Sequence, residues 1–398
     1  MGIYWIDAEQ GSHIQKELIM TKIQKQFKEK ADFEHLRKVI MRETTDGPVP
    51  IIELSADAEI MSEVTGIDFP PSDYNKLKTM NQEGELGEID EETMLIGMRF
   101  IDLSINFSKM VGYDYVTGNA IVPIRRTGAN LKNDPNYEET VRNWQEEHQG
   151  IIMSREDYNA YTWPSIDSIN LVALDVLPGM IPPEMKVLCF VQGIFEDLRS
   201  LMGFEQMAYK SIDEPDLIGD ILENLTVLAE TAVDRAAAHP ASGAIFYADD
   251  LGHTNSTMVS PKFLREWVFP RQKRIADACH KHGKPFIFHC CGQVDAIMDD
   301  LIETVGIDAR HSFQDNIEPV EEVYKKYGDR IAILGGLDVD LLSRGTQDQV
   351  RTRTREILEA CAPGGGFCMG SGNSLANFIN VENYYAMLDE TRKWNETH

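Results

Sequence analysis

The stretch that decides the fold runs from residue 243 to residue 292 and reads GAIFYADDLGHTNSTMVSPKFLREWVFPRQKRIADACHKHGKPFIFHCCG. It contains two short apolar runs, Ala244–Ala248 and Pro285–Cys290, whose β-branched and aromatic residues are typical of buried strands. Between them lies a helical stretch, Pro261–His282, which begins with a proline and has Ser260 as a capping residue. This order predicts a unit in which a helix connects two parallel buried strands.

The same alternation extends in both directions along the chain. Six further runs have strand character: Val49–Leu54, Ala120–Ile124, Lys186–Gln192, Ile307–Ser312, Arg330–Leu334 and Gly366–Met369. Helices are expected at Pro215–Ala238, Gln293–Val305, Glu318–Tyr327, Thr346–Ala362 and Val381–Trp394. Eight buried strands that alternate with helices predict an α/β fold of the (β/α)8 TIM-barrel type. An open doubly wound sheet is the alternative, because long insertions at 56–118 and 125–185 interrupt the first half.

The chain divides into two parts on this interpretation. Residues 1–47 are charged and carry apolar side chains at helical spacing, so they predict an N-terminal helical extension. Residues 48–398 are assigned to the barrel.

Composition narrows the classes of function. The 398 residues include 38 Lys and Arg against 65 Asp and Glu, which gives a net charge of −27. So acidic a surface repels phosphate backbones and anionic lipid, and neither nucleic acid nor a membrane is expected as a partner. The six cysteines are too sparse for a disulfide scaffold, and no apolar run is long enough for a membrane span. We therefore expect a reduced, cytoplasmic protein. The composition is compatible with a homo-oligomer.

Polar residues follow five successive predicted strands, at the barrel end where such enzymes carry their chemistry. His289 and Cys291 are two residues apart on extended chain and share a face, and an imidazole beside a thiolate suits zinc. A third ligand must come from another strand end, where Cys368, Ser371, His311 or an aspartate is available. The alternative is that the cysteine is a small buried residue without a ligand role.

Two adjacent aspartates, Asp249 and Asp250, follow the strand Ala244–Ala248. Their side chains point to opposite sides, so one of them is expected at the mouth as a general acid or base, a substrate clamp or a metal ligand. The alternative for the other is a helix cap or a loop hydrogen-bond acceptor. The expected substrate contacts are Asp249, His311, Gln314, Asp338 and Ser371.

A series of short motifs runs through about half of the chain. They are Gly193-Ile194-Phe195, Leu201-Met202-Gly203, Ala248-Asp249-Asp250-Leu251-Gly252, Val259-Ser260-Pro261-Lys262-Phe263, His282-Gly283-Lys284-Pro285, His289-Cys290-Cys291-Gly292, Tyr327-Gly328-Asp329-Arg330, Gly335-Gly336-Leu337-Asp338 and Pro363-Gly364-Gly365-Gly366. In these motifs the chain resembles the uroporphyrinogen decarboxylase superfamily, which implies a TIM barrel. The decarboxylases of that superfamily grip porphyrinogen carboxylates with an arginine-rich segment. The corresponding region here, His35–Ala58, lacks that segment.

The resemblance therefore favours the other branch of the superfamily, the cobalamin (corrinoid)-dependent methyltransferases. These enzymes hold zinc with a His-x-Cys pair and a later cysteine. His289 and Cys291 match the pair, whereas Ser371 stands at the position of the later cysteine and Cys368 lies three residues earlier. The implied metal ligands are His289, Cys291 and Cys368.

A site with fewer thiolates is a harder Lewis acid, so the resemblance implies the first methyltransferase of an O-demethylase system. Zinc would activate the oxygen of a methoxylated aromatic, and the cobalt of a corrinoid protein would take the methyl group. Asp250 or His253 would protonate or orient the leaving group. A metal-independent decarboxylase and a non-catalytic barrel that binds a small molecule are the two alternatives.

Overall fold

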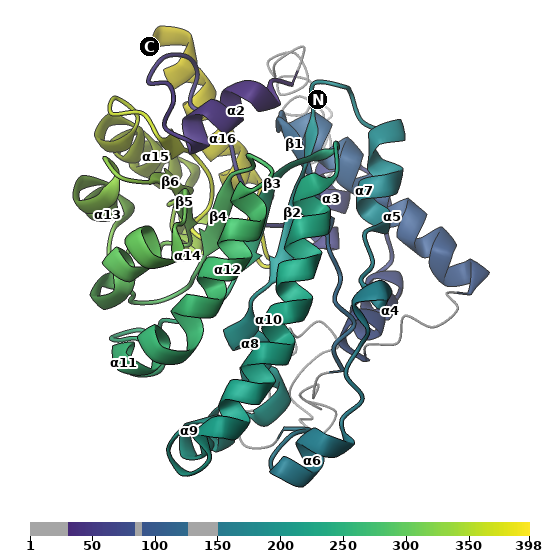
Figure 1. The fold of residues 1–398 in the computed structure, drawn as a ribbon. Coiled ribbons are helices and arrows are strands. Elements are labelled where there is room, and N and C mark those ends of the chain that lie inside the picture. Colours follow the sequence, from purple (N-terminus) through teal and green to yellow (C-terminus); the bar gives the residue numbers. More distant parts are fainter. Residues whose placement is uncertain (1–30, 84–89, 126–149) are drawn as a thin grey trace, which may run out of the picture.

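A computed structural model describes residues 31–83, 90–125 and 150–398, with the side chains of residues 78–83 excepted. Residues 1–30 of the predicted extension lie outside these ranges. Seven parallel strands form one curled sheet (Figure 1). They are β1 (Tyr115–Asn119), β2 (Lys186–Gln192), β3 (Ser242–Ala248), β4 (Phe286–His289), β5 (Ala309–His311), β6 (Ala332–Leu334) and β7 (Phe367–Cys368). Neighbouring strands follow one another in chain order, which confirms the TIM-barrel prediction and excludes a doubly wound sheet, whose order reverses.

The eighth position of the barrel is irregular. The expected strand Val49–Leu54 makes a single parallel bridge, between Ile51 and Met369 beside β7. Prolines at 48 and 50 explain this, because they remove backbone donors from the ladder. On the other side, the Tyr115 hydroxyl of β1 accepts a hydrogen bond from the Glu53 N–H at 2.7 Å and donates to the Glu53 carbonyl at 2.9 Å. One side chain thus joins the two edges of the sheet.

The prediction of a strand at Ala120–Ile124 was wrong by five residues. The strand β1 lies at Tyr115–Asn119, and Pro123 prevents the later run from pairing regularly. Gly118 within β1 packs so closely that an added Cβ would lie 2.7 Å from Val187.

The helices that cover the strands include those predicted at 215–238, 261–282, 318–327, 346–362 and 381–394, together with three that were not predicted, at 194–202, 204–213 and 339–344. The covering helices are α8 (Ile194–Met202), α9 (Phe204–Asp213), α10 (Pro215–Ala238), α11 (Pro261–Phe263), α12 (Phe269–His280), α13 (Val320–Tyr327), α14 (Val339–Arg344), α15 (Gln347–Cys361) and α16 (Val381–Thr397). The expected helix Pro261–His282 contains a π-helical turn, η3 (Leu264–Val268), just before Pro270, which cannot donate to the helical ladder. The expected helix Gln293–Val305 is present from residue 295 to residue 305 with irregular geometry, because η4 (Asp295–Ile297) continues through residues 298–299 into the π-helical η5 (Asp300–Val305).

The helix α2 (Phe33–Ile40) lies across the amino ends of the strands. The backbone N–H of Phe33 donates to the carbonyl of Glu184, just before β2. An added Cβ at Gly243, at the start of β3, would lie 2.2 Å from the Phe33 ring. This described part of the predicted extension therefore packs into the barrel core.

The insertion between the eighth position and β1 is helical. It contains α3 (Ala58–Thr65), α4 (Pro71–Glu83) and α5 (Glu91–Val111), which lie on the β1 side of the barrel (Figure 1). The second insertion contributes α6 (Arg155–Ala160), the turns η1 (Ile166–Ser168) and η2 (Leu177–Gly179), and α7 (Val172–Val176).

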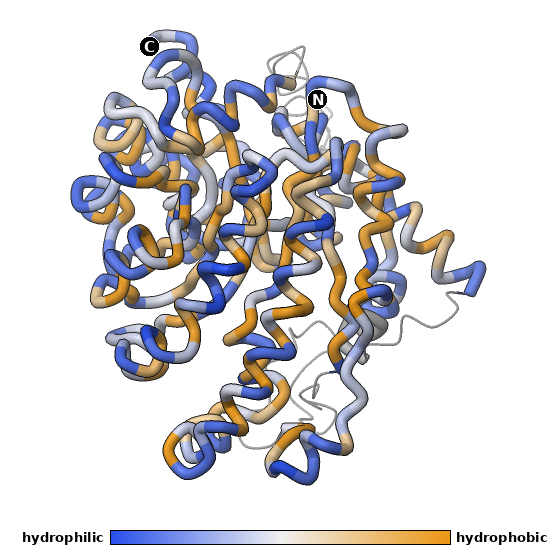
Figure 2. The backbone as a smooth tube through the Cα atoms, in the orientation of Figure 1, coloured by the Kyte–Doolittle hydropathy of each residue, from blue (hydrophilic) through white to orange (hydrophobic). Residues whose placement is uncertain are grey.

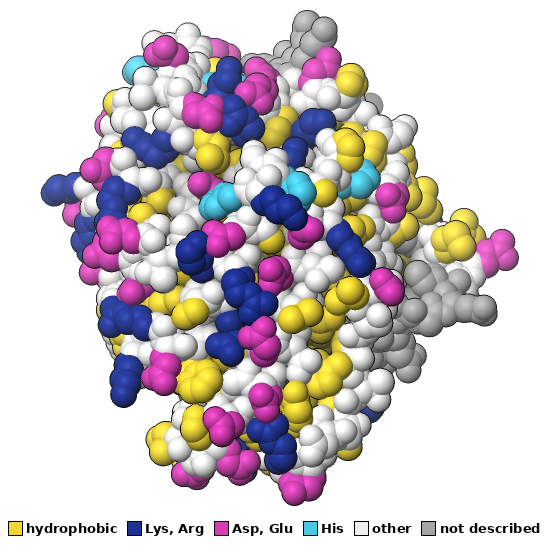
Figure 3. Space-filling model, in the orientation of Figure 1, with side chains coloured by type: hydrophobic (Ala, Val, Ile, Leu, Met, Phe, Trp, Pro, Cys, Tyr) yellow, Lys and Arg dark blue, Asp and Glu magenta, His cyan; other side chains and the backbone are white. Residues whose placement is uncertain are grey.

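Hydropathy follows the layers of the barrel. Figure 2 shows hydrophobic residues concentrated on the strands and on the sides of the helices that face them. On the surface that α10 and α12 share, basic and acidic side chains are interspersed (Figure 3), for example Arg274 with Glu223 at 2.7 Å and Glu230 at 2.8 Å. No helix among the described residues is long and apolar enough to cross a bilayer.

Candidate active site

Two glycines bring the loops after β3 and β4 into backbone contact. A Cβ at Gly252 would lie 2.5 Å from the carbonyl oxygen of Cys291, and a Cβ at Gly292 would lie 2.4 Å from the backbone of Gly252. Gly292 also has a φ of +79°, which favours glycine. As a result, the backbone N–H of Cys291 donates to Oδ1 of Asp250 at 2.7 Å.

Asp250, His289 and Cys291 form a compact group at this end of the barrel. One ligand atom from each lies within 4.8 Å of the other two. His289 Nε2 lies 3.4 Å from Cys291 Sγ and 3.8 Å from Asp250 Oδ1. Zinc bonds of about 2.0–2.3 Å in a tetrahedral shell separate neighbouring ligand atoms by about 3.4–3.6 Å. The chemistry and spacing of this donor set therefore fit a zinc ion with three protein ligands and an open fourth position.

The Cys291 sulfur accepts hydrogen bonds from two side chains that the sequence predictions did not include. Asn373 Nδ2 donates at 3.2 Å and Ser312 Oγ at 3.4 Å. Ser312 has a φ of +90°, a strained value for a residue other than glycine, and such strain is often found at functional sites. In the metal-free protein, burial raises the pKa of the Cys291 thiol to about 12, so metal binding must displace a proton. Ser312 and Asn373 both belong to polar stretches that follow predicted strands, and this position was the signal by which the sequence could have identified them.

His289 is oriented by the next strand. Its Nδ1 lies 2.8 Å from Nδ1 of His311, so one of these nitrogens must carry the shared proton. If His289 Nε2 binds a metal, the proton of His289 lies on its Nδ1, which then donates to Nδ1 of His311. The proton of His311 then lies on its own Nε2 atom, which is buried and has no hydrogen-bond partner in the described structure. Burial lowers the pKa of both histidines, which favours the neutral form that a metal ligand requires.

Ser371 lies beside a buried carboxyl group. Oε1 of Glu53 accepts from the Ser371 N–H at 2.8 Å, and Glu53 Oε2 contacts the Ser371 hydroxyl. That hydroxyl also lies 2.7 Å from the Asn373 carbonyl oxygen. A hydroxyl has one proton, so the Ser371 hydroxyl donates either to Glu53 Oε2 or to the Asn373 carbonyl; when it donates to the carbonyl, its contact with Glu53 needs a proton on the carboxyl group. Burial raises the pKa of Glu53 to about 8, which agrees with a neutral acid.

Glu53 is the one acidic residue in the apolar run 49–54, a signal that the sequence analysis did not use. Its contact with Ser371 continues through Asn373 to the sulfur of Cys291. The predicted substrate contact Ser371 thus lies between a buried acid and the candidate metal centre.

Asp249 has the environment of a capping group, the alternative that the sequence also allowed. Its carboxylate accepts from the N–H groups of Phe195 at 3.2 Å and Glu196 at 2.8 Å, in the first turn of α8. Gln272 and Tyr247 donate to the same carboxylate at 2.8 and 3.2 Å. Burial raises the pKa of Asp249 to about 7, although these hydrogen bonds lower it.

The other predicted site residues lie outside the three-residue group. Cys368 is fully buried in β7, so the structure brings Asp250 rather than Cys368 to the His289–Cys291 pair. His253 and Gln314 are exposed. Asp338 caps α14 through the N–H of residue 340 at 2.7 Å. Their predicted roles remain predictions.

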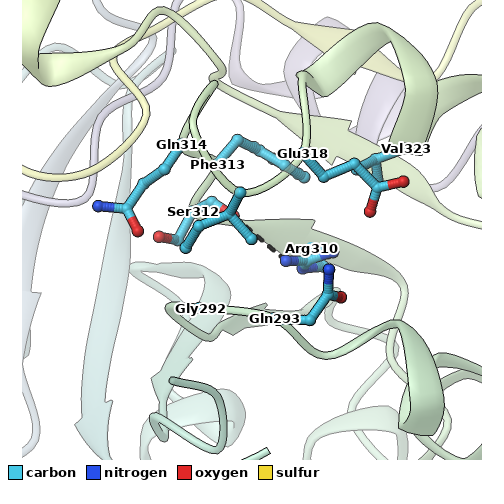
Figure 4. Close-up of a pocket in the computed structure, with 9 residues that line it drawn as sticks. Gly292, Gln293, Arg310, Ser312, Phe313, Gln314, Glu318 and Val323 are labelled. Carbon is cyan, nitrogen blue, oxygen red and sulfur yellow. Dashed lines mark hydrogen bonds between the residues drawn. The ribbon is translucent and has the colours of Figure 1, made fainter. Parts of the chain in front are cut away.

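A small cavity of about 10 Å³ lies beside Arg310 of β5 (Figure 4), with room for about one water molecule. The Arg310 guanidinium donates to the Ser312 carbonyl at 3.5 Å, and the Gln314 side chain points away from it. Gly292 and Ser312 also line this cavity, so it lies beside the loop that carries Cys291.

A much larger cavity, of about 450 Å³, lies between β1 and α5, and we call it the α5 cavity. Glu53, Tyr113 and Tyr115 belong to its lining, together with aliphatic, methionine and phenylalanine side chains and with serine, threonine and asparagine side chains. Among the described residues that line it, no Lys, Arg or His occurs, and Glu53 is the one carboxyl group.

Comparison with known proteins agrees with this barrel. The family model described as uroporphyrinogen decarboxylase (URO-D) matches residues 133–394, more than half of the chain. The chain belongs to the URO-D family, as its motifs predicted. A solved methyltransferase from Methanosarcina mazei has a TM-score of 0.63 at 15% identity, over 90% of this chain and 97% of that one, which confirms the fold.

Two curated relatives match about half of the chain. The methylated-thiol–coenzyme M methyltransferase of Methanosarcina mazei is 30% identical over 189 residues, which are 47% of this chain and 49% of that protein. The uroporphyrinogen decarboxylase of Anaeromyxobacter dehalogenans is 25% identical over 190 residues, 47% of this chain and 51% of that protein. The chain thus spans about half the length of these relatives, one a methyltransferase and the other a decarboxylase.

Proposed function

We propose that this chain is a zinc-dependent, cytoplasmic methyltransferase that moves a methyl group between a small substrate and the cobalt of a corrinoid protein. The observation that carries the proposal is the group of Asp250, His289 and Cys291, whose spacing suits tetrahedral zinc. The methyltransferase relative supports the reaction class. A methoxylated aromatic is the best candidate for the substrate.

Zinc held by these residues would supply Lewis acidity that polarises the heteroatom bearing the methyl group. The hydrogen bonds from Asn373 and Ser312 draw charge from the Cys291 sulfur, which keeps the centre electrophilic. His311 fixes the ring of His289 through its Nδ1 contact. Asp250 has 31% of its side chain exposed, so water or a leaving group can reach it.

A metal-independent decarboxylase is less well supported. A porphyrinogen carries several carboxylates, which need cationic partners in a buried site. The described lining of the α5 cavity offers no such cation. A non-catalytic barrel does not explain why three metal-ligating side chains converge at the chemically active end of the strands.

Metal analysis of the purified protein tests this proposal. We expect about one zinc per chain, lost in the His289→Ala/Cys291→Ala double variant and kept in the control His253→Ala. The zinc-loaded protein should methylate reduced cobalamin from a methoxylated aromatic, and the double variant should not. Stoichiometric zinc in the double variant, or equal methyl transfer by it, would contradict the proposed centre.

A further inference from the structure

The α5 cavity is built mainly by a part of the chain that the family model does not match. Apart from Asn170, Val172 and Val176, its lining residues lie between Glu53 and Ile121. The matched region begins only at residue 133. The cavity is therefore formed mainly by the helical insertion and by β1 with the residues beside it, outside the segment that the family model matches.

The size and chemistry of this cavity suit a small organic ligand. Its volume of about 450 Å³ is within the range of small-molecule sites, and a cavity of about 150 Å³ already holds benzene. The rings of Tyr113 and Tyr115 stack in its wall, with centroids 5.1 Å apart. Met94 and Met98 line the cavity and are still 57% and 40% exposed, so it reaches the surface along α5.

The polar groups of the wall define the charge of the ligand. Glu53 is 2% exposed and no cationic side chain is among the described residues that line the cavity, which favours the neutral form of its carboxyl group. A neutral carboxyl group keeps free lone pairs that accept a hydrogen bond from a ligand hydroxyl. An anionic ligand would lose its hydration beside an acid, with no cation among the described lining residues to replace that hydration.

We propose that the α5 cavity is the substrate chamber of this protein, and that it selects uncharged, ring-sized molecules with a hydroxyl group over carboxylated ones. A methoxyphenol is the substrate class that meets these conditions; that this ligand is a methyl donor rests on the proposed function. Glu53 is the proposed polar contact among several in the wall, and its hydrogen bonds through Ser371 and Asn373 connect the chamber to the sulfur of Cys291.

Gly97 offers a direct way to fill the chamber. It lines the cavity from the middle of α5, and a Cβ placed there would have no heavy atom within 4 Å. Gly97→Phe therefore puts a ring into the cavity without a clash at the backbone. Gly97→Ala is the matched control, because it makes the same backbone change and leaves the cavity open.

Calorimetric titration with guaiacol, a neutral methoxyphenol, and vanillate, its carboxylated analogue, tests the proposal. We expect the full chain to bind guaiacol at least about tenfold more tightly than vanillate. Gly97→Phe should weaken guaiacol binding by at least about tenfold, and Gly97→Ala should leave it nearly unchanged. No guaiacol binding by the parent, equal binding of the two ligands, or no effect of Gly97→Phe would overturn the proposal.

The titration needs neither metal nor corrinoid, so the two proposals fail separately. Parent protein that has been stripped of metal with a chelator keeps the whole cavity lining, and it should still bind guaiacol. Guaiacol binding without zinc or methyl transfer would refute the proposed function alone. Zinc-dependent methyl transfer whose KM for guaiacol is unchanged in Gly97→Phe would refute the chamber alone.

Discussion

Replacement of Glu53 by glutamine should stabilise the protein at neutral and alkaline pH. Burial raises the pKa of this carboxyl group from 4.5 to about 8. Because the folded pKa is the higher one, the stability that the protonated acid provides is complete below pH 4.5 and is lost as pH rises to about 8. At about 1.4 kcal/mol for each pKa unit, the loss is about 3 kcal/mol at pH 7 and about 5 kcal/mol above pH 8.

Glutamine reproduces the hydrogen bonds of the neutral acid. In Glu53→Gln, the amide oxygen accepts from the Ser371 N–H and the amide NH2 donates to the Ser371 hydroxyl, which remains free to donate to Asn373. The variant should therefore match the parent near pH 4.5, and its advantage in unfolding free energy should grow to several kcal/mol by pH 8.5.

Urea unfolding of the parent and Glu53→Gln at pH 5, 7 and 8.5, followed by circular dichroism, provides the measurement. Glu359→Gln, at an exposed position of α15, is the control and should show no growing difference. A Glu53→Gln variant that is less stable than the parent at pH 8.5, or equally stable at every pH, would show that Glu53 is a carboxylate. The Ser371 hydroxyl would then be the donor to Glu53 Oε2.

Three further variants test the supports of the candidate metal centre. Asp249→Ala removes the acceptor for four donors, and we expect urea unfolding to show a loss of about 2–4 kcal/mol; a loss under about 0.5 kcal/mol would contradict the capping role. His311→Phe removes the partner of His289 Nδ1, and zinc affinity measured against a competing chelator should fall about 10- to 100-fold. Unchanged affinity would refute that orienting contact. Gly252→Ala forces apart the loops that join Asp250 to Cys291, so both stability and zinc affinity should fall, and a change in neither would refute the close approach.

The barrel itself was predictable because its signals are local. Buried parallel strands such as β3 and β4 are continuous apolar runs, and α10 begins with a proline and ends at the predicted residue. The first strands were harder to predict, because prolines interrupt the runs 49–54 and 120–124 and pairing depended on a tyrosine side chain. Only the fold shows that Tyr115 joins the two edges.

The pair His289 and Cys291 could be found from spacing, because residues two apart on extended chain share a face. Their neighbours could not, since Asp250, Ser312 and Asn373 come from three other strand ends and meet Cys291 only when the barrel curls. The α5 cavity and the protonation of Glu53 also required the tertiary structure. Sequence alone thus determined the strand order, the family motifs and one local ligand pair, all short-range patterns. Burial and contacts between distant segments, which set hydrogen bonds and pKa values, were decided only by the folded barrel.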